Sequence, residues 1–509
     1  MGNNKANLAA NFVGRGWTAL LSIALVPLYL HYLGLEGYGL VGFFITLQAT
    51  VGVVDFGLTT SLNRELARRS IEPESTAGTR DLVRTLEIGY CAIGILSGLV
   101  IAWAAPFVAT HWINKAVTLS STSVTRSVRL MGLVFACQWP ISFYGGGLLG
   151  LQHQVLLNSI NVVSATLKGF GAILVLKFIS PTVEAFLLWQ AFVSLGQTLC
   201  VGIALWKKLP VEGHRAQFRL SSISEIWAFA SALAIMAAIA LLLQQMDKIV
   251  VSAIVPLGIF GYYVLASTLA GAISIPAAPI GDTLFPIYAR LARQNNLAEL
   301  VRQYHRGCQM IASVVFPVAS VLAWFSEPLL FAWTGSQSTA AAASRVTSML
   351  VLGTALSVPM TTLDHLQMAY GWLVPAIRVR ILGAVILLGS LYLFVPRCGI
   401  LGGAYAWICV NVAYLLITPW FVFRRLIPKE KKRWLWHDTI VPIVAATAIG
   451  GVLRLITLEP SRRAILIHLV AYTIVTLFGT AVTTPNGRQM IRQLGVFYMG
   501  KFSKSAESA

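Results

Sequence analysis

The sequence predicts an all-α polytopic membrane protein with about fourteen transmembrane helices, and three observations support that prediction. Of its 509 residues, 57% are hydrophobic and only 11% are charged, whereas a soluble protein carries about 25% charged residues. Several apolar runs reach the roughly 20 residues that a helix needs to cross a bilayer. One long stretch, 33–69, has a second copy near the middle of the chain.

Apolar runs separated by charged or turn residues predict two sets of six spans and a final pair. The first set lies near 9–30, 38–60, 84–106, 128–150, 156–179 and 184–206. After a basic stretch, the second set lies near 226–246, 258–281, 306–326, 345–365, 374–395 and 400–423. The last two spans lie near 439–458 and 464–483. We therefore expect an N-terminal six-helix lobe, a C-terminal six-helix lobe, and two additional helices with a cytoplasmic tail, over 1–222, 223–428 and 429–509.

The repeated stretch relates the two lobes. Its first copy opens Leu33-Gly34-Leu35-Glu36-Gly37-Tyr38 and closes Leu66-Ala67-Arg68-Arg69. Its second copy opens Leu257-Gly258-Ile259-Phe260-Gly261-Tyr262 and closes Leu291-Ala292-Arg293-Gln294. Self-similarity on this scale suggests two similar halves. Because six spans return the chain to the side where it began, we expect a pseudo-twofold axis along the membrane normal and a central cleft between the lobes.

The net charge of +19 follows from membrane topology and does not indicate nucleic-acid binding. Lys and Arg gather in alternate connections, as the positive-inside rule predicts. One side collects Arg64, Arg68, Arg69, Arg80, Lys207, Lys208, Arg215, Arg219, Arg290, Arg293, Arg302, Arg306 and the cluster 424–433. An even number of spans then places both termini in the cytoplasm. The loops on the outer side are short, and no soluble domain is expected.

No cofactor or metal site is expected. The six cysteines are scattered, mostly in apolar runs, which indicates core packing. Histidines show no ligand-like spacing, since they lie in different segments at His31, His111, His153 and His365. The chain carries no Walker A sequence, so ATP-driven export is excluded.

A series of short motifs follows the spans in order. The first half carries Pro27, Leu33-Gly34-x-x-Gly37-Tyr38-Gly39, Asp55-Phe56-Gly57-Leu58 and Arg64-Glu65. The second half carries Asp247-Lys248, Gly258-x-x-Gly261-Tyr262, Leu284-Phe285-Pro286 and Gly399-Ile400-Leu401-Gly402-Gly403-Ala404. In order and spacing these motifs resemble the bacterial polysaccharide-export flippases, of the O-antigen type, in the multidrug/oligosaccharidyl-lipid/polysaccharide exporter superfamily. The resemblance covers roughly residues 8–425.

This resemblance implies a flippase and not an enzyme. Such proteins move an undecaprenyl-pyrophosphate-linked oligosaccharide repeat unit from the cytoplasmic to the outer leaflet of the bacterial cytoplasmic (inner) membrane. They work by alternating access and serve cell-surface polysaccharide biosynthesis, such as that of lipopolysaccharide. The partners implied are the lipid-linked oligosaccharide and the lipid bilayer. A polysaccharide polymerase and other biosynthesis proteins are candidate partners, and nucleic acid is not.

Four cations inside predicted spans are the candidate substrate-binding residues: Arg15, Lys168, Arg378 and Arg380. A charge in the bilayer costs several kcal/mol unless it is paired or hydrated, about 2.5–3.5 kcal/mol on insertion scales. A cationic cleft would suit a pyrophosphate, which guanidinium binds in bidentate fashion. The structural alternatives remain open: Lys168 could snorkel to an interface, and the two arginines could be ordinary positive-inside anchors. Since Arg378 and Arg380 point about 200° apart on a helix, at most one can face the cleft.

Acidic residues at comparable depth are few, and four charged residues are candidates for ion coupling or structural ion pairs: Asp55, Asp247, Lys248 and Asp364. Asp55 falls at the depth of Arg15, so these two could neutralise each other. Asp247-Lys248 could tie a helix end. Asp364, followed by His365, could serve proton coupling or lie at a solvated helix end.

Three other functions remain as alternatives. An ion-coupled multidrug or cation antiporter of the same superfamily would want deep carboxylates, which this chain has sparsely. A membrane polysaccharide polymerase or glycosyltransferase usually carries a sizeable outer loop with catalytic residues, and the outer loops here are short. A scaffold for a biosynthetic complex would leave the deep cations unexplained.

Overall fold

The computed structural model describes residues 14–55, 57–70, 78–113, 118–210, 216–218, 239, 243–456 and 461–489. Helices dominate these residues, and no strand occurs among them. The chain divides into two compact units, Met1–Gly261 and Tyr262–Ala509. The predicted lobe boundaries after 222 and 428 stay a prediction.

The first unit is built of long helices joined by short turns. It opens with a helix over 14–24 and closes with one over 243–254. Between them lie α2 (Val26–Val51), η1 (Gly52–Asp55), α3 (Leu58–Arg69), α4 (Thr79–Phe107), η3 (Val108–Trp112), α5 (Ser121–Gly150), α6 (Gln154–Thr166), η4 (Leu167–Gly171), α7 (Ala172–Phe178) and α8 (Val183–Lys208).

Gly34 interrupts α2 at the point where the sequence predicts a turn between the first two spans. Its φ of 69° and ψ of 179° are not helical. Such a positive φ is open to glycine because glycine has no Cβ. The backbone therefore changes direction here, between the predicted spans 9–30 and 38–60.

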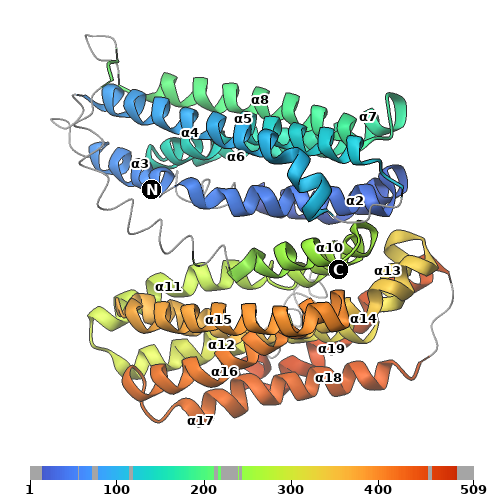
Figure 1. Ribbon diagram of the computed structural model, residues 1–509. Helices are drawn as coiled ribbons and strands as arrows, with labels where there is room; N and C mark the ends of the chain where they lie inside the picture. Colours follow the sequence, from blue (N-terminus) through green and yellow to red (C-terminus); the bar gives the residue numbers. More distant parts are fainter. Residues whose placement is uncertain are drawn as a thin grey trace, which may run out of the picture. The chain divides into compact units, whose positions relative to one another are not determined.

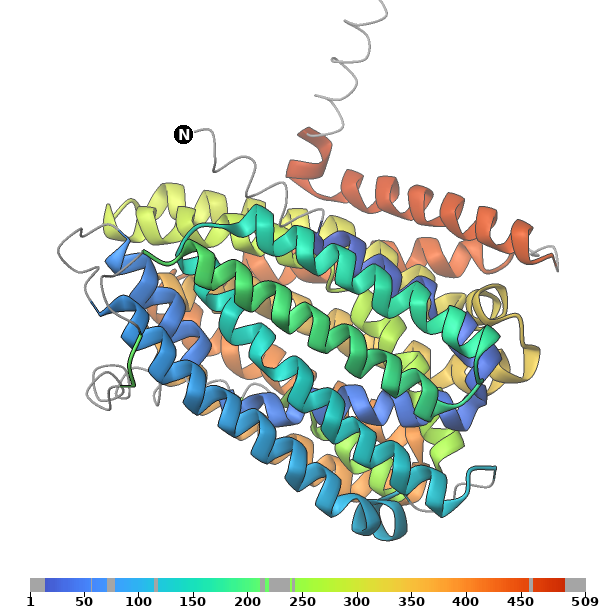
Figure 2. The same cartoon turned by 90° about the horizontal axis from the view of Figure 1, so that it is seen from above.

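Two glycines let α4 and α5 approach closely. A Cβ built on Gly98 would lie 2.6 Å from the carbonyl oxygen of Gly132, which is closer than van der Waals contact allows. Helix backbones in membrane proteins commonly meet at such small residues. The helix α5 also packs against α8, and Figure 2 shows α4, α5 and α8 running side by side. These three helices position the α6–α7 segment, which also packs on α8.

The remaining helices lie in the second unit, except that α10 begins before its boundary (Figure 1). They are α10 (Leu257–Ala272), α11 (Ala277–Arg293), α12 (Leu297–Trp324), α13 (Ser326–Thr334), α14 (Gln337–Ala369), α15 (Leu373–Cys398), α16 (Ile400–Arg425), α17 (Lys431–Arg433), η5 (Trp434–Ile440), α18 (Val441–Leu453) and α19 (Arg462–Thr483). The helix α16 packs against both α14 and α15. The helix α12 packs against α11, α14, α18 and α19.

The span predicted near 258–281 is not one continuous helix, because the structure breaks this stretch into α10 and α11. Residues 273–276 form turns between the two helices, and Pro276 precedes the first residue of α11. Proline lacks the N–H that a continuous helix would need there. The span predicted near 226–246 lies largely outside the described residues.

Ten helices in the described part of the chain are long and apolar enough to cross a membrane, by their length and composition. They include α2, α4 with η3, the α6–α7 segment, α8, α12, α14, α15, α16, the α17–α18 segment and α19. The protein is therefore a multi-pass α-helical membrane protein. The count of fourteen spans stays a prediction.

Candidate functional site

Lys168 lies in the middle of a candidate span, Gln154–Phe178, where the helix widens into a π-helical segment, η4. Such π-bulges are rare and often occur at functional sites. Three successive carbonyl oxygens here accept hydrogen bonds from side chains of other helices. Trp189 Nε1 donates to Leu167 O at 2.8 Å, Gln190 Nε2 to Lys168 O at 3.1 Å, and Tyr29 OH to Gly169 O at 3.3 Å. These bonds from α8 and α2 hold the bulge in place.

The Lys168 side chain is half-buried and ends against a neutral amide. Its Nζ donates to Gln197 Oε1 at 3.0 Å, and Gln197 Nε2 donates to Asn161 Oδ1 at 3.0 Å. Among the described residues, no carboxylate pairs with Lys168. Amide oxygens solvate an ammonium group but leave its positive charge uncompensated. The arrangement can therefore receive an anion.

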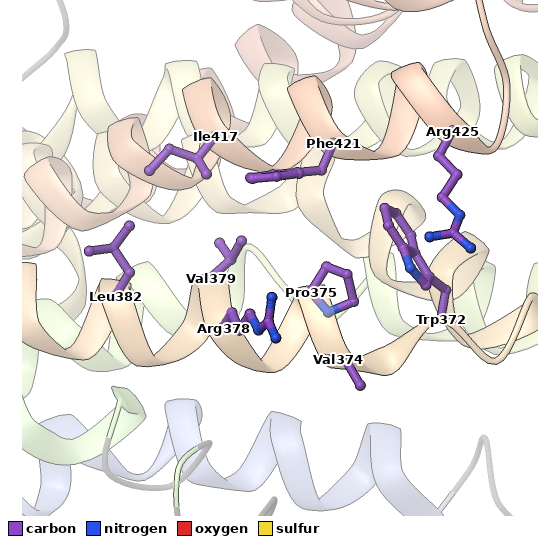
Figure 3. A pocket seen from close by; sticks show the side chains of 9 residues that line it. All are labelled: Trp372, Val374, Pro375, Arg378, Val379, Leu382, Ile417, Phe421 and Arg425. Carbon is purple, nitrogen blue, oxygen red and sulfur yellow. The ribbon is translucent and has the colours of Figure 1, made fainter.

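A pocket of about 440 Å³ lies along α15 and α16 in the second unit (Figure 3). Its lining combines apolar side chains with two guanidinium groups, those of Arg378 and Arg425. The Arg425 guanidinium lies over the Trp372 ring, 5.0 Å from its centroid. Arg378 has no hydrogen-bond or ion-pair partner in the part of the chain that the structure describes. An apolar pocket with two such cations suits a ligand that is both lipidic and anionic.

Arg380 lies differently from Arg378, as their spacing on one helix requires. Its guanidinium donates to Asp364 Oδ2 of α14 at 3.0 Å. This ion pair neutralises both charges and joins α15 to α14. Of the two arginines, Arg378 is therefore the one whose charge no carboxylate neutralises among the described residues.

Arg15 and Asp55 occupy separate surroundings. Arg15 is exposed on the helix over 14–24. The Asp55 carboxylate accepts hydrogen bonds from Thr59 Oγ1 and Tyr90 OH, both at 2.6 Å. In the described residues these hydroxyl groups, rather than the Arg15 guanidinium, are the hydrogen-bond partners of Asp55.

Asp247 and Lys248 both lie in the helix over 243–254. The Asp247 side chain is buried, and Lys248 Nζ is 3.8 Å from Asp247 Oδ1. Lys248 also donates to the carbonyl of Gln244, one turn earlier, at 3.3 Å. These contacts are local to one helix.

The sequence analysis does not identify three charged groups that the structure brings out. The first is Arg425, which the sequence places only within the basic cluster 424–433. Glu87 accepts bonds from Tyr144 OH at 2.7 Å, Trp206 Nε1 at 2.9 Å and Arg84 at 2.7 Å, and so joins α4, α5 and α8. His305 lies between Glu430 and Asp438, which are far from it in sequence. The sequence could have identified Glu87, because it is an acidic residue inside a predicted span.

Known proteins match both the sequence and the fold. A protein from Shigella flexneri named "Putative O-antigen transporter" is 21% identical over 425 residues, covering 82% of this chain and 97% of that protein. A solved structure described as "Lipid II flippase MurJ, inward closed conformation" has a TM-score of 0.69 at 12% identity, and covers 94% of this chain and 98% of its own. An inward-facing multidrug resistance MATE family transporter of the MOP superfamily has a TM-score of 0.64 at 15% identity, covering 80% and 94% of the two chains.

These likenesses establish a flippase-like and MATE-like helical fold. The family model described as "Polysaccharide biosynthesis protein" matches residues 5–292, more than half of the chain. This chain belongs to the polysaccharide biosynthesis protein family.

Proposed function

We propose that this protein flips an undecaprenyl-pyrophosphate-linked oligosaccharide repeat unit across the bacterial cytoplasmic membrane for cell-surface polysaccharide biosynthesis. It would act as a transporter by alternating access, not as an enzyme. Both termini would lie in the cytoplasm, as the distribution of Lys and Arg predicts. Family membership and the resemblance to an O-antigen transporter and to a lipid II flippase support the class of substrate.

The observation that carries the proposal is the chemistry around Lys168. An ammonium group in the middle of a candidate span is costly unless a partner stabilises it. Here the described partner is the neutral amide of Gln197, so a substrate that brings negative charge completes the site. A pyrophosphate supplies this charge, and a cationic drug does not. This difference favours lipid-linked sugar over the cations of a multidrug antiporter.

The pocket of Arg378 and Arg425 supports the same class of substrate from within the second unit. Guanidinium groups bind phosphate oxygens in bidentate fashion. The apolar remainder of the lining, which includes Leu382, Ile417 and Phe421, suits a prenyl chain. We propose this pocket as a second contact site for a prenyl pyrophosphate.

The test compares cells lacking this protein with cells that carry it or its Lys168→Gln variant. Lipid-linked oligosaccharide on the cytoplasmic leaflet and polysaccharide at the cell surface are measured together. Loss of the protein is expected to raise the amount of lipid-linked oligosaccharide on the cytoplasmic leaflet and to lower the amount of surface polysaccharide. The Lys168→Gln variant is expected to restore neither amount to the wild-type level.

Two other outcomes would redirect the assignment. Unchanged glycans with altered resistance to cationic compounds would indicate the antiporter. Single repeat units that reach the outer leaflet but stay unpolymerised would indicate a polymerase.

A further inference from the structure

The second unit contains a buried histidine with a carboxylate against each ring nitrogen. His305 of α12 is almost fully buried. Its Nδ1 contacts Asp438 Oδ2 of η5, and its Nε2 lies 2.9 Å from Glu430 Oε2, just before α17. We call His305, Glu430 and Asp438 the histidine centre.

This geometry requires an additional proton. A neutral imidazole has one N–H donor and one bare nitrogen, and a carboxylate can only accept. With a neutral ring and two carboxylates, one contact would therefore set a nitrogen lone pair against an anionic oxygen. Both contacts become hydrogen bonds when the three groups share two protons, either as an imidazolium ion or with one carboxylic acid. The centre is thus built around one bound proton.

Other titratable side chains lie around the histidine centre. Tyr304, Cys308 and Tyr288 lie in the apolar core around the centre and are neutral near pH 7. The basic residues next to the centre in sequence, Arg306, Lys429 and Lys431, are exposed. From α14 the Thr362 hydroxyl meets Cys308, and the His437 side chain of η5 is exposed. The helix α18 carries no titratable residue, and those of α19 lie in its first half, where Arg462 binds the carbonyl of Ala332.

The centre also holds the C-terminal helices in place. Gln309, one turn after His305, donates to Asp438 Oδ1 at 2.8 Å and accepts from the backbone N–H of Asn486 at 3.2 Å. The segments before α17, within η5 and after α19 are therefore all tied to one face of α12. The partly exposed Glu430, with 26% of its side chain accessible, offers a path for the proton, whereas Asp438 is fully enclosed.

We propose that His305, Glu430 and Asp438 form a proton-binding centre that fastens the C-terminal helix pair, α18 and α19, to α12. Loss of the proton removes one of the two hydrogen bonds to the ring and places a lone pair against a carboxylate. The helix pair then loosens. This inference does not depend on the identity of the transported substrate.

Hydrogen–deuterium exchange of the full-length protein in lipid nanodiscs tests the proposal across about pH 5 to 9. The exchange rate of α18 amides is divided by that of α4 amides in the same sample, which cancels the intrinsic pH dependence of exchange. In the wild-type protein this ratio is expected to rise with pH. It should rise by up to about tenfold per pH unit while the centre loses its proton, because the deprotonated fraction rises up to tenfold per unit there, and it should level off once the proton is lost.

The decisive variant is Glu430→Gln. A glutamine can donate to Nε2, so a neutral ring satisfies both partners, and the α18 ratio should stay low at every pH. Glu299→Gln is the matched control: Glu299 also lies at the start of a helix with a similar exposed fraction, 24%, and pairs with Arg302. This control should keep the wild-type rise.

His305→Gln provides a second variant, since its side chain does not titrate. Its ratio should already be raised at low pH and should change less with pH than the wild-type ratio, because only the two carboxylates remain. A wild-type ratio that stays flat, or a Glu430→Gln variant that rises as the wild type does, would overturn the proposal.

Discussion

Two cations inside predicted spans, Lys168 and Arg380, have opposite kinds of partner. Lys168 ends on the amide oxygen of Gln197, 3.0 Å away, in a chain of neutral groups that continues to Asn161. Arg380 ends on the carboxylate of Asp364, also 3.0 Å away. The distances are equal, but only the second contact cancels the charge. A cation with a carboxylate partner is explained by structure, whereas a cation held by amides keeps an uncompensated charge, which we propose serves the substrate.

The largest effect is expected from Lys168→Gln. Glutamine can keep a hydrogen bond to Gln197 but carries no charge, so transport should fall about 10- to 100-fold, the value of one hydrogen bond to a charged group. Surface polysaccharide and membrane abundance are measured together in complemented cells. The control is Lys177→Gln, which replaces an exposed lysine of the same α6–α7 segment. This variant should transport normally. Normal transport by Lys168→Gln would remove Lys168 from the site.

A carboxylate introduced beside Lys168 should neutralise its charge, as Asp364 neutralises the charge of Arg380. In Gln197→Glu the new carboxylate pairs with the ammonium group, and the Asn161 amide can rotate to donate to it. We expect a folded, abundant protein whose transport falls almost as far as that of Lys168→Gln. If Gln197→Glu transports as well as the wild type, a free positive charge at Lys168 is not needed.

Arg378→Gln should lower transport more than Arg380→Gln, although the two residues are neighbours on α15. Arg378 lines the pocket with Arg425, whereas Arg380 is neutralised by Asp364. Because Arg378 is exposed, the loss is expected to be roughly fivefold, equivalent to about 1 kcal/mol. Transport by each variant is normalised to its abundance. Equal losses, or a larger loss for Arg380→Gln, would contradict this assignment.

The smallest effect on transport is expected from Asp364→Asn, which gives Arg380 an amide partner like that of Lys168. Both side chains of the pair are about one-third exposed, so we expect a loss of about 1 kcal/mol or less of stability and little loss of transport per molecule. Thermal unfolding of the single variants and of Asp364→Asn/Arg380→Gln forms a double-mutant cycle. A coupling of zero would show that the ion pair does not join α14 to α15.

The sequence predicts the broad fold because long apolar runs leave little choice but membrane-spanning helices. It places the break at Gly34 correctly, since the repeated glycine motif marks the turn. It misses the break within 258–281, where hydropathy continues through a turn that Pro276 helps to form. Hydropathy averages over a window and does not register the loss of single backbone hydrogen bonds.

The candidate sites were predictable only in part. Depth in a span identified Lys168 and Arg380 as charges that need an explanation. Their partners, Gln197 and Asp364, come from other helices, and sequence order does not reveal which helix faces meet. The π-bulge at 167–171 and the contacts of His305 with Glu430 and Asp438 depend on such packing. In the sequence, Arg425 is one of several basic residues after a predicted span. Only the structure shows that it lines a pocket together with Trp372.

The most direct test of the central claim measures the binding of undecaprenyl pyrophosphate to the purified protein by native mass spectrometry. Undecaprenol, which has the same chain without the pyrophosphate, is the matched ligand. The wild-type protein should prefer the pyrophosphate, and Lys168→Gln should lose that preference at least about tenfold. An unchanged preference in Lys168→Gln would contradict the claim that this lysine keeps its charge for the substrate.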